Sequence, residues 1–452
     1  MSAANGAISG LDWRGDPGAL LLRGARLFDP RAGIDGAHDV VIRDGRIAEI
    51  TGAGEGEQPD GAELINAEGL TAMPAFFDPH VHLRDLGEAY KEDIETGTRA
   101  AAAGGYCGVV GMANTVPVTD EPETISALRE QAGREASVPT GFVATVTVGM
   151  RGRELTEMAA LREAGALGFS DDGLPITSGR VMRRALQYQH LVGGNILLHE
   201  EDPELTGDGV MGEGAISAEL GLAGVPDVSE STMIARDGAL CLYESARAHV
   251  QHLSARRSVE AIEFAKQQGA RITAELTPHH LVLTDEEVRS LDSRFKMNPP
   301  LRTEDDRQAL IEALRSGAVD CIGTDHAPHA SNEKEVPFEQ AMMGVIGLET
   351  AFPVLFTELV QPGIIELGTL VERMTAGAGL FDLEIPTIAV DAEANIALVD
   401  LEAEWEAGAD GWESRSANSC FVGRRLRSRP VVTIVAGSVA YRQRAFSMGA
   451  VA

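Results

Sequence analysis

The chain has 452 residues, 44% of them hydrophobic, which is enough for one large domain or two ordinary domains with a sizeable core. Its 69 acidic residues against 38 Lys and Arg give a formal net charge of −31. Such a chain repels nucleic acid and anionic membrane surfaces. The acidic balance fits either a cytoplasm of high internal salt or an ordinary acidic cytosolic enzyme.

The cysteines and the first residues indicate the compartment. The four cysteines are scattered and form no CxxC pair, which argues for a reducing cytoplasm and against a disulfide framework or a thiolate zinc site. The opening stretch, MSAANGAISGLDWRGD, lacks the basic and apolar regions of a signal peptide. No apolar run reaches the roughly 18 residues of a membrane span. We therefore expect a soluble cytoplasmic protein.

Both ends of the chain are predicted to be rich in β-strands. Near the N-terminus, ALLLRGARLFDP and DVVIRDGRIAEI contain strand-like apolar runs, and Asp44-Gly45 is a hairpin signal. Near the C-terminus, NIALVDL is a strand candidate, and VVTIVAGSVAYR indicates two strands joined by Ala436-Gly437. We predict that residues 1–74 and 386–452 form one small composite β domain.

The central block, residues 75–385, alternates short apolar strands with helical segments, several of which end in glycine, as helix C-caps tend to. Eight βα units in about 310 residues predict a (β/α)8 barrel, with a doubly wound sheet as the alternative. The predicted strands are 75–83, 106–112, 141–148, 166–172, 195–200, 249–254, 271–276 and 319–326.

Histidines and aspartates stand at the ends of five of these strands. His80 and His82 lie two apart, so both side chains leave an extended strand on the same side. In a (β/α)8 barrel the carboxyl ends of the strands form the active site. Four histidines and at least two aspartates, with no cysteine, suit zinc or another divalent metal, with two ions sharing one carboxylate. The remaining candidates are Asp171 or Asp172, His199, His252 and Asp325.

A single histidine near a strand end is more often a core or surface residue than a ligand. We assign His38, His190 and His249 to structure or surface. His279 and His280 either support the site or belong to a turn. His326, beside Asp325, is expected to support the site.

Several motifs together resemble the class I bacterial dihydroorotases of the amidohydrolase superfamily. HxH alone would indicate only the superfamily, whereas KMNPPLR with TDHAPH narrows the resemblance to dihydroorotases and close cyclic-amidase relatives. It runs over about residues 70–385 and continues more weakly into both ends. The motifs are DPHVHLRD, KEDIETGTRAAAAGG, FSDDG, HEEDPEL, TAELTPHHL, KMNPPLR, GTDHAPH and IGLETAFP.

The resemblance implies a distorted (β/α)8 TIM barrel over 75–385 and a small β-sandwich built from 1–74 and 386–452. It also implies two Zn2+ ions per subunit. His80 and His82 would bind the first ion with Asp325, and His199 and His252 would bind the second. Many relatives bridge the ions with a carboxylated lysine, but no lysine lies between Lys91 and Lys266. An aspartate must then bridge, and the class I pattern puts it at Asp172.

The residues alone leave open which aspartate of the pair faces inward, because adjacent strand residues face opposite ways. Asp171 would then be a supporting acceptor or a cap on the following turn. The implied reaction is the reversible cyclisation of N-carbamoyl-L-aspartate to (S)-dihydroorotate with release of water, in pyrimidine biosynthesis. In the hydrolytic direction a hydroxide held between the ions would attack, and Asp325 would shuttle the proton.

Arg84, two residues beyond His82 on the same face, is suited to a bidentate clamp on the free carboxylate of the substrate. The alternative for Arg84 is a surface salt bridge with Asp85 or Glu88. By resemblance, Asn114 and His329 share the carboxylate, and Asn298 and the backbone at Met343–Gly344 contact the ring amide. The substrate-binding set is thus His82, Arg84, Asn114, Asn298, His329, Met343 and Gly344.

Two small departures from the family pattern remove no ligand: Ala113 stands where proline is usual, and Ala75 where glycine is common. Competing interpretations are another cyclic amidase, such as an allantoinase or hydantoinase, and a non-catalytic partner of aspartate transcarbamoylase. Besides a small-molecule substrate, the resemblance is compatible with a homodimer and with association with aspartate transcarbamoylase. No nucleic-acid or membrane partner is expected.

Overall fold

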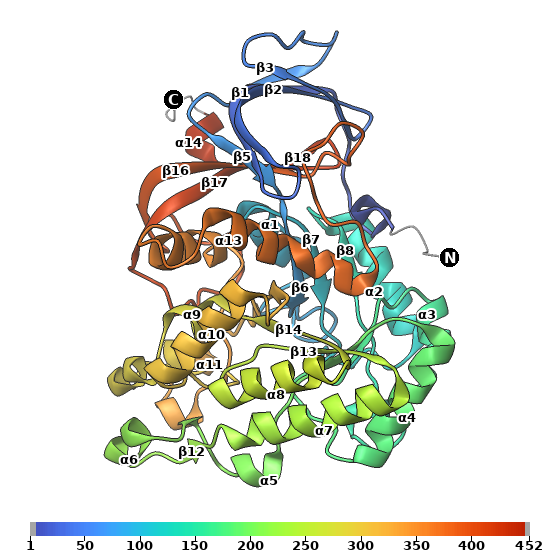
Figure 1. The fold of residues 1–452 in the computed structure, drawn as a ribbon, viewed down its shortest axis with the longest axis vertical. Coiled ribbons are helices and arrows are strands. Elements are labelled where there is room, and N and C mark those ends of the chain that lie inside the picture. Colours follow the sequence, from blue (N-terminus) through green and yellow to red (C-terminus); the bar gives the residue numbers. More distant parts are fainter. Residues whose placement is uncertain (1–5, 448–452) are drawn as a thin grey trace.

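The computed structural model describes residues 6–447 and divides visually into a β-rich end and a larger α/β region (Figure 1). The β-rich end is one mixed sheet with strand order β18-β17-β16-β5-β1-β2-β3, and β4 pairs with β1. Its strands are β1 (Leu20–Asp29), β2 (Ile34–Arg43), β3 (Arg46–Gly52), β4 (Glu63–Asn66), β5 (Thr71–Pro74), β16 (Ile396–Glu406), β17 (Arg425–Val435) and β18 (Ser438–Arg442).

The two chain ends share this sheet because β5 pairs with β16, with Ala72 opposite Leu398. Two tight turns have the chemistry that hairpins require. Asp44 and Gly45 both have positive φ between β2 and β3, and Ala436 and Gly437 do the same between β17 and β18. Both hairpin predictions are therefore confirmed.

The α/β region contains eight short parallel strands, which confirms the α/β class. They form two parallel sheets, β6-β7-β8 and β9-β10-β13-β14-β15. Isolated parallel bridges connect the sheets at both edges, between Ala144 and Phe169 and between Val81 and His326. The strands are β6 (Phe76–Val81), β7 (Tyr106–Gly111), β8 (Thr140–Phe142), β9 (Phe169–Ser170), β10 (Ile196–Leu198), β13 (Arg247–Val250), β14 (Arg271–Leu276) and β15 (Cys321–Ile322).

Seven of the eight observed strands are shorter than predicted, and β14 has its predicted bounds. The prediction for 166–172 included both aspartates of the acid pair, whereas β9 ends at Ser170. The chain leaves the strand there because the Asp171 carboxylate accepts hydrogen bonds from the backbone amides of Val146 and Thr147. Side chain to backbone bonds of this kind compete with a strand ladder.

Helices cover the outside of the parallel strands, and α7 and α8 lie at the end far from the β-rich sheet (Figure 1). Sequence signals fix their ends: Thr303 caps the start of α10, and Gly317, with a φ of 86°, follows its end. The helices are α1 (Ile94–Ala103), α2 (Pro122–Glu135), α3 (Met158–Glu163), α4 (Gly179–Val192), α5 (Pro203–Thr206), α6 (Ala215–Leu220), α7 (Val228–Glu244), α8 (Arg256–Gln267), α9 (Pro278–Val282), α10 (Glu304–Ser316), α11 (Ser331–Lys334), α12 (Ala351–Leu355), α13 (Leu367–Thr375) and α14 (Arg444–Ser447). A strand pair, β11 (Met211–Gly212) and β12 (Gly224–Val225), precedes α7.

The strand that carries the HxH pair is buried on both faces. Phe76 stacks on Phe352, with ring centroids 5.0 Å apart, while its neighbour Phe77 turns to the other side and meets Phe381. Each fully buried aromatic side chain contributes about 1.5–3 kcal/mol to folding. This packing holds β6 rigidly, and with it the two histidines at its end.

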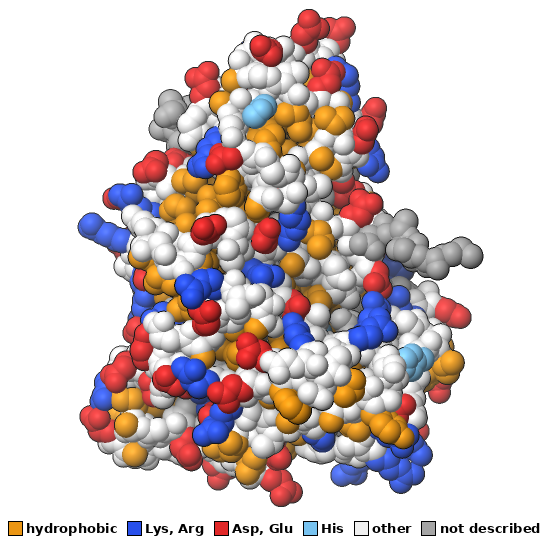
Figure 2. Space-filling view, viewed as in Figure 1, with side chains coloured by type: hydrophobic (Ala, Val, Ile, Leu, Met, Phe, Trp, Pro, Cys, Tyr) orange, Lys and Arg blue, Asp and Glu red, His pale blue; other side chains and the backbone are white. Residues whose placement is uncertain are grey.

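The surface mixes charges of both signs. On the face in Figure 2, acidic and basic side chains alternate with scattered hydrophobic ones. Within residues 6–447, none of the helices combines the length and the apolar character needed to cross a bilayer.

Candidate active site

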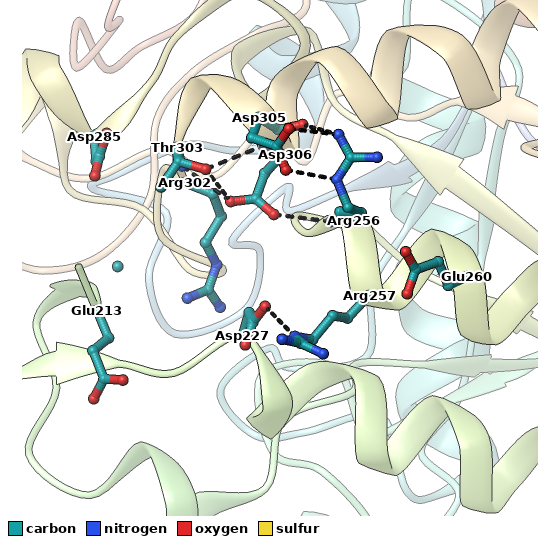
Figure 3. A pocket seen from close by; sticks show the side chains of 11 residues that line it. Glu213, Asp227, Arg256, Arg257, Glu260, Asp285, Arg302, Thr303, Asp305 and Asp306 are labelled. Carbon is teal, nitrogen blue, oxygen red and sulfur yellow. Dashed lines mark hydrogen bonds and ion pairs between the residues drawn. The ribbon is translucent and has the colours of Figure 1, made fainter. Parts of the chain in front are cut away.

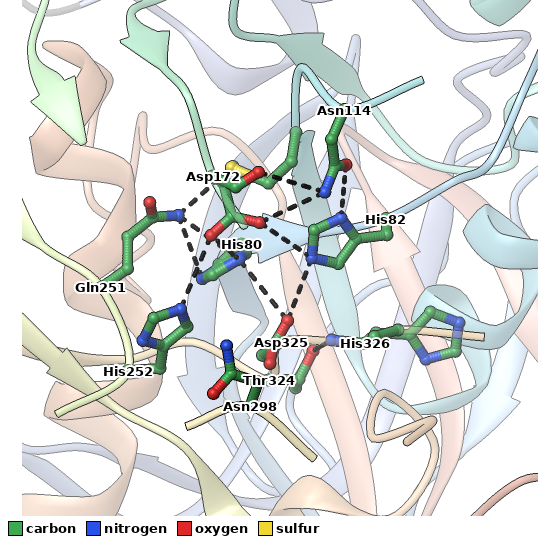
Figure 4. A network of polar contacts seen from close by, with 12 residues as sticks. His80, His82, Asn114, Asp172, Gln251, His252, Asn298, Thr324, Asp325 and His326 are labelled. Atoms are coloured by element: carbon green, nitrogen blue, oxygen red, sulfur yellow. Dashed lines mark hydrogen bonds and ion pairs between the residues drawn. The ribbon is translucent and has the colours of Figure 1, made fainter. Parts of the chain in front are cut away.

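The ligand-type residues from five strand ends meet in one buried cluster. His80 lies in β6 and His82 just beyond it, with ring centroids 5.3 Å apart. His252, just after β13, lies on the other side of His80, at 5.3 Å. Figure 4 shows these side chains converging from different strands. The cluster consists of His80, His82, Asp172, His199, His252 and Asp325.

Asp172 occupies the centre of the cluster. Its Oδ1 lies 3.7 Å from His80 Nε2 and 3.5 Å from both His199 Nδ1 and His252 Nε2. Its Oδ2 lies 3.4 Å from His82 Nε2. Burial raises the pKa of Asp172, but the imidazoles of His80, His199 and His252 more than offset this and lower that pKa well below its usual value.

Asp171 faces away from the cluster. Its carboxylate accepts hydrogen bonds from Val146 N at 2.8 Å, from Thr147 N at 3.1 Å and from the Thr147 hydroxyl. Burial raises the pKa of Asp171 to about 6, against these bonds. The two aspartates therefore have different environments, and only Asp172 points toward the histidines.

Asp325 closes the cluster on the side opposite Asp172. Its Oδ1 lies 3.0 Å from His82 Nε2 and 3.6 Å from His80 Nε2. Burial raises the pKa of Asp325, but the hydrogen bond from His82 and the charge of His80 lower it below its usual value. Asp325 has a φ of 48°, a left-handed conformation that non-glycine residues rarely adopt. Backbone strain of this kind is frequent at active sites.

The donor set fits divalent metal ions. Ligand atoms of His80, His82 and Asp325, and those of His80, Asp172 and His252, each lie within 4.8 Å of one another. Asp172 Oδ1 is buried without a hydrogen-bond partner among residues 6–447. In addition, His199 Nδ1 and His252 Nε2 face each other at 2.9 Å. Facing imidazole nitrogens beside an unpartnered carboxylate oxygen are the nitrogen and oxygen ligands that zinc prefers.

A carboxylate that the sequence analysis did not single out orients His80. Glu275, within β14, places Oε1 2.6 Å from His80 Nδ1 and Oε2 3.1 Å from His249 Nε2. Burial raises the pKa of Glu275, but the two histidines lower it to about 2. The sequence could have indicated Glu275, since it is the one charged residue in the strand end TAEL. His249, predicted to be structural or on the surface, is buried and contacts Glu275.

The two histidines of TPHHL differ in their roles. His280 lies in α9, where it contacts the Pro299 carbonyl at 3.0 Å and the Thr277 hydroxyl at 2.8 Å, so it has a structural role, although in a helix instead of the predicted turn. His279 Nε2 is buried without a hydrogen-bond partner among residues 6–447, and burial lowers the pKa of His279 to about 4. His326 lies 3.3 Å from Glu92, on the side of the strand away from the cluster.

A cavity of about 450 Å³ opens over the cluster, and every predicted substrate-binding residue lines it. Arg84 has a φ of 58°, and its Nε donates to the Pro328 carbonyl at 3.2 Å. Among the described residues Arg84 forms no salt bridge with Asp85 or Glu88, because Glu88 pairs with Lys91 and Asp85 accepts from Ile94 N. The lining residues are His82, Arg84, Asn114, Asp172, Gly173, His199, His252, Asn298, Asp325, Ala327, His329, Ala341, Met342, Met343 and Gly344.

Two asparagines of the lining also contact candidate metal ligands. Asn114 Oδ1 accepts from His82 Nδ1 at 2.8 Å, which fixes the orientation of that ring. Asn298 Nδ2 lies 3.4 Å from His199 Nε2 and donates to Glu201 at 2.7 Å. Both side chains thus join the cluster to the cavity above it.

The turn at Met343–Gly344 is held by bonds within the protein. The Gly344 amide donates to the Lys296 carbonyl at 3.0 Å, and His329 Nε2 donates to the Met343 carbonyl at 2.8 Å. Gly344 has a φ of 135°, and a Cβ at this position would lie 2.8 Å from the Cβ of Ala327. Only glycine fits this close approach.

A second cavity, of about 400 Å³, lies between β11, the start of α7, α8 and the start of α10 (Figure 3). It is lined by charged side chains, and two of its arginines pair with acids of the same lining. Arg256 binds Asp305 at 2.6 Å, and Arg257 binds Asp227 at 3.0 Å. The charges of these pairs are already compensated, in contrast to the cluster around Asp172.

Known proteins resemble this chain along nearly its whole length. A family model described as dihydro-orotase-like matches residues 69–258. A dihydroorotase of Syntrophotalea carbinolica is 43% identical over 424 residues, covering 94% of this chain and 99% of that protein. A dihydroorotase of Geobacter metallireducens is 42% identical over 426 residues, covering 94% of this chain and 100% of that protein.

Solved structures of the same fold include an L-hydantoinase (dihydropyrimidinase) from Arthrobacter aurescens, with a TM-score of 0.83, 25% identity and coverage of 96% of both chains. A dihydropyrimidinase from Brevibacillus agri has a TM-score of 0.81 and 22% identity, covering 94% of this chain and 96% of that one. The identity to the curated relatives is far higher and extends over whole chains. This protein belongs to the dihydroorotase family.

Proposed function

We propose that this protein is a metal-dependent dihydroorotase, which interconverts N-carbamoyl-L-aspartate and (S)-dihydroorotate with release or uptake of water. The observation that carries the proposal is the Asp172 carboxylate at the centre of four imidazoles, in the place that a lysine takes in many cyclic amidases. The cavity above it is lined by a guanidinium, Arg84, and an amide, Asn114, which suit a carboxylate-bearing ring. Relatives that match 94% of the chain are named dihydroorotase.

We assign the eight parallel strands of 75–385 to a distorted (β/α)8 barrel, and 1–74 with 386–452 to a β-sandwich domain. The bridges at Ala144–Phe169 and Val81–His326 support ring closure, since they connect the edges of the two parallel sheets. In a barrel the cluster would lie at the carboxyl ends of the strands, where catalytic groups of this fold gather. The four cysteines, all free and buried, suit a reducing cytoplasm.

The metal positions follow from the donor geometry. His80, His82 and Asp325 would hold one divalent ion, His199 and His252 a second, and Asp172 would be shared between them. Histidine nitrogens with carboxylate oxygens and no thiolate suit zinc. When bound, such ions polarise the amide carbonyl of the ring and lower the pKa of a water molecule so that it can attack.

Asp325 is the residue that moves the proton. Its position beside His82 faces the cavity where the amide carbonyl would lie. In the hydrolytic direction it takes the proton of the attacking water and gives it to the ring nitrogen as the carbon–nitrogen bond breaks. A positioned acid–base group typically contributes about 10²–10⁴-fold to the rate.

Arg84 and the Met343–Gly344 turn hold the substrate. The Nε of Arg84 is used by the Pro328 carbonyl, which leaves its terminal nitrogens for the free carboxylate. The Gly344 amide is used by Lys296, so Met343 N–H is the backbone donor assigned to the ring. Asn114 and His329 would complete the carboxylate site, and Asn298 the ring site. Homodimerisation and association with aspartate transcarbamoylase stay predictions.

The test is turnover of three cyclic amides by purified protein supplied with zinc. We expect hydrolysis of dihydroorotate, little turnover of hydantoin or allantoin, and loss of activity in Asp325→Ala. Hydantoin or allantoin turnover without dihydroorotate turnover would refute the proposal in favour of another cyclic amidase. Bound zinc with no turnover of any of the three would favour a non-catalytic partner.

A further inference from the structure

The loop between β16 and β17, residues 407–424, belongs to the β-rich end of the chain, yet it contacts the loops around the active-site cavity. The Ser416 hydroxyl donates to the Lys91 carbonyl at 2.6 Å, and the amide of Ser414 donates to Glu349 at 3.1 Å. Further along the loop, Asn418 is buried, with 6% of its surface exposed. A segment distant in sequence therefore lies directly behind the substrate side of the cavity.

Both the oxygen and the nitrogen of the Asn418 side-chain amide form hydrogen bonds to backbone groups of two loops. Its Oδ1 accepts from the His329 amide at 3.1 Å. Its Nδ2 donates to the Ala327 carbonyl at 3.2 Å and to the Gly344 carbonyl at 3.1 Å. One amide side chain thus connects the loop that carries Asp325 and His329 to the turn at Met343–Gly344.

The side chain of Lys334 also forms hydrogen bonds to the turn at Met343–Gly344. Its Nζ donates to the carbonyls of Met342 at 2.9 Å, Gly344 at 3.0 Å and Lys296 at 3.1 Å. The Gly344 carbonyl therefore receives two donors, one from Lys334 and one from Asn418. Lys334 does not bond to the Ala327 carbonyl or the His329 amide, and both of these groups bond to the side chain of Asn418.

Asn418 does not line the active-site cavity. It lines a neighbouring cavity of about 540 Å³, and His329 separates the two because it lines both. Any effect of Asn418 on substrate must therefore pass through its bonded partners Ala327, His329 and Gly344, which line the active-site cavity. Asparagine suits this place because its amide offers one acceptor and two donors at once, which neither aspartate nor leucine does.

We propose that Asn418 is a positioning residue for substrate binding, which sets the spacing between His329 and the Met343–Gly344 turn. This proposal rests on the function proposed above, in which those two elements bind the carboxylate and the ring of dihydroorotate. A displacement of about 1 Å in a binding group is enough to change reactivity by up to about 10²-fold. The β-rich end of the chain thereby takes part in substrate recognition.

The test is the isosteric Asn418→Asp. It keeps an acceptor for the His329 amide but turns a carboxylate oxygen toward the carbonyls of Ala327 and Gly344. We expect the KM for dihydroorotate to rise about tenfold or more with kcat changed by less than about threefold, the pattern of lost ground-state binding. The zinc content should equal that of the wild type, because Asn418 contacts none of the candidate ligands.

The matched control is Ser416→Ala, which removes the bond to Lys91 in the same loop but touches neither substrate-binding element. We expect it to lower the melting temperature while KM stays within about twofold, because the lost hydrogen bond stabilises the fold but holds no substrate-binding group. An unchanged KM in active Asn418→Asp, or an equal rise in Ser416→Ala, would overturn the proposal. If the aspartate variant does not fold, Asn418→Ser carries the same expectation.

Wild-type turnover separates the two proposals. If the wild type hydrolyses hydantoin or allantoin instead of dihydroorotate, the proposed function fails, and the KM for that amide then decides the role of Asn418. A wild type that binds zinc and turns over no cyclic amide would overturn both.

Discussion

Asp171 and Asp172 are adjacent in the chain, but their carboxylates point in different directions and contact different parts of the protein. Asp171 accepts three hydrogen bonds from the segment that follows β8, at Val146 and Thr147. Asp172 faces the imidazoles, and its Oδ1 lies 3.5 Å from His252. The opposite directions of their pKa shifts follow from these surroundings. The pair is thus one structural acid followed by one candidate metal bridge.

Separate substitution of Asp171 and Asp172 tests this assignment of a structural acid and a metal bridge. In Asp172→Ala we expect zinc and activity to be lost together, by more than about 100-fold, since removal of a mere orienting partner costs about 10–100-fold in metal affinity. Asp171→Asn, the matched control, should keep at least one ion per subunit and lose mainly stability. Zinc content of the purified proteins and their initial rates give the answer. Full zinc in the first variant and none in the second would mean that the roles are reversed.

Asp325→Asn should separate proton transfer from binding. The amide keeps the shape of the side chain but cannot carry the proton, so we expect kcat to fall about 10²–10⁴-fold. Zinc at the position of His199 and His252 should remain, because those ligands are untouched. Steady-state kinetics with metal analysis would measure both. A kcat within tenfold of the wild type would exclude Asp325 as the proton carrier.

Arg84→Gln should affect only substrates that carry a carboxylate. Hydrogen bonds to charged groups contribute about 1.5–3 kcal/mol, so kcat/KM for dihydroorotate should fall about 10–150-fold. Dihydrouracil has the same ring without the carboxylate, so we expect the variant and the wild type to hydrolyse it at equal rates. Equal losses for both substrates would show that Arg84 acts on the fold of the site instead of on the carboxylate.

Glu275→Gln should weaken metal binding without removing a ligand. The side chain holds His80 by a 2.6 Å contact and keeps its shape in the variant, but it loses its charge. Partners of metal-bound histidines typically contribute about 10–100-fold in affinity. Zinc dissociation constants, measured by competition with a chelator, would give this value. Glu349→Gln, which replaces a partly buried acid that contacts no candidate ligand, is the control and should bind zinc as the wild type does.

Glu349 predicts a pH dependence of stability. Burial raises its pKa from 4.5 in the unfolded chain to about 7, against hydrogen bonds from the amides of Glu413 and Ser414. The folded state therefore holds a proton that the unfolded state releases between these values. The free energy of unfolding should fall as the pH rises from 4.5 to 7, by roughly 1.4 kcal/mol for each unit of pKa difference, and stay low above pH 7.

Urea unfolding at pH 5 and pH 8 would measure this effect. Glu349→Gln mimics the protonated acid, so its unfolding free energy should fall less between the two pH values than that of the wild type. The difference between the two proteins isolates Glu349 from the general repulsion of a chain with a net charge of −31. The same fall in both proteins would show that Glu349 titrates normally.

The sequence was most informative where a local pattern carries the chemistry. HxH predicts two side chains on one side of a strand, and His80 and His82 both reach the cluster. The absence of lysine between Lys91 and Lys266 predicts an aspartate at its centre, where Asp172 lies. Alternation along the chain also predicts the eight parallel strands, although it overestimates the lengths of all but β14.

Other features depend on contacts between residues far apart in the chain, which no local pattern records. Glu275 is 195 positions from His80, and only the packing of β14 near β6 brings the two together. Asn418 is 89 positions from His329 and lies in a loop that looked like part of a peripheral β domain. The direction of Asp171 likewise depends on where the segment after β8 runs, which its own sequence does not specify.

The pairing of β5 with β16 and the reach of the β16–β17 loop have a practical consequence. Residues 75–385 contain all six candidate ligands, so they would appear to be a self-sufficient catalytic fragment. Cut out alone, that fragment would lack Asn418 and the loop that borders Lys91 and Glu349. Such a fragment would keep the six candidate ligands but lose the contacts behind the substrate side of the cavity, and a tail taken from a relative would have to restore those contacts.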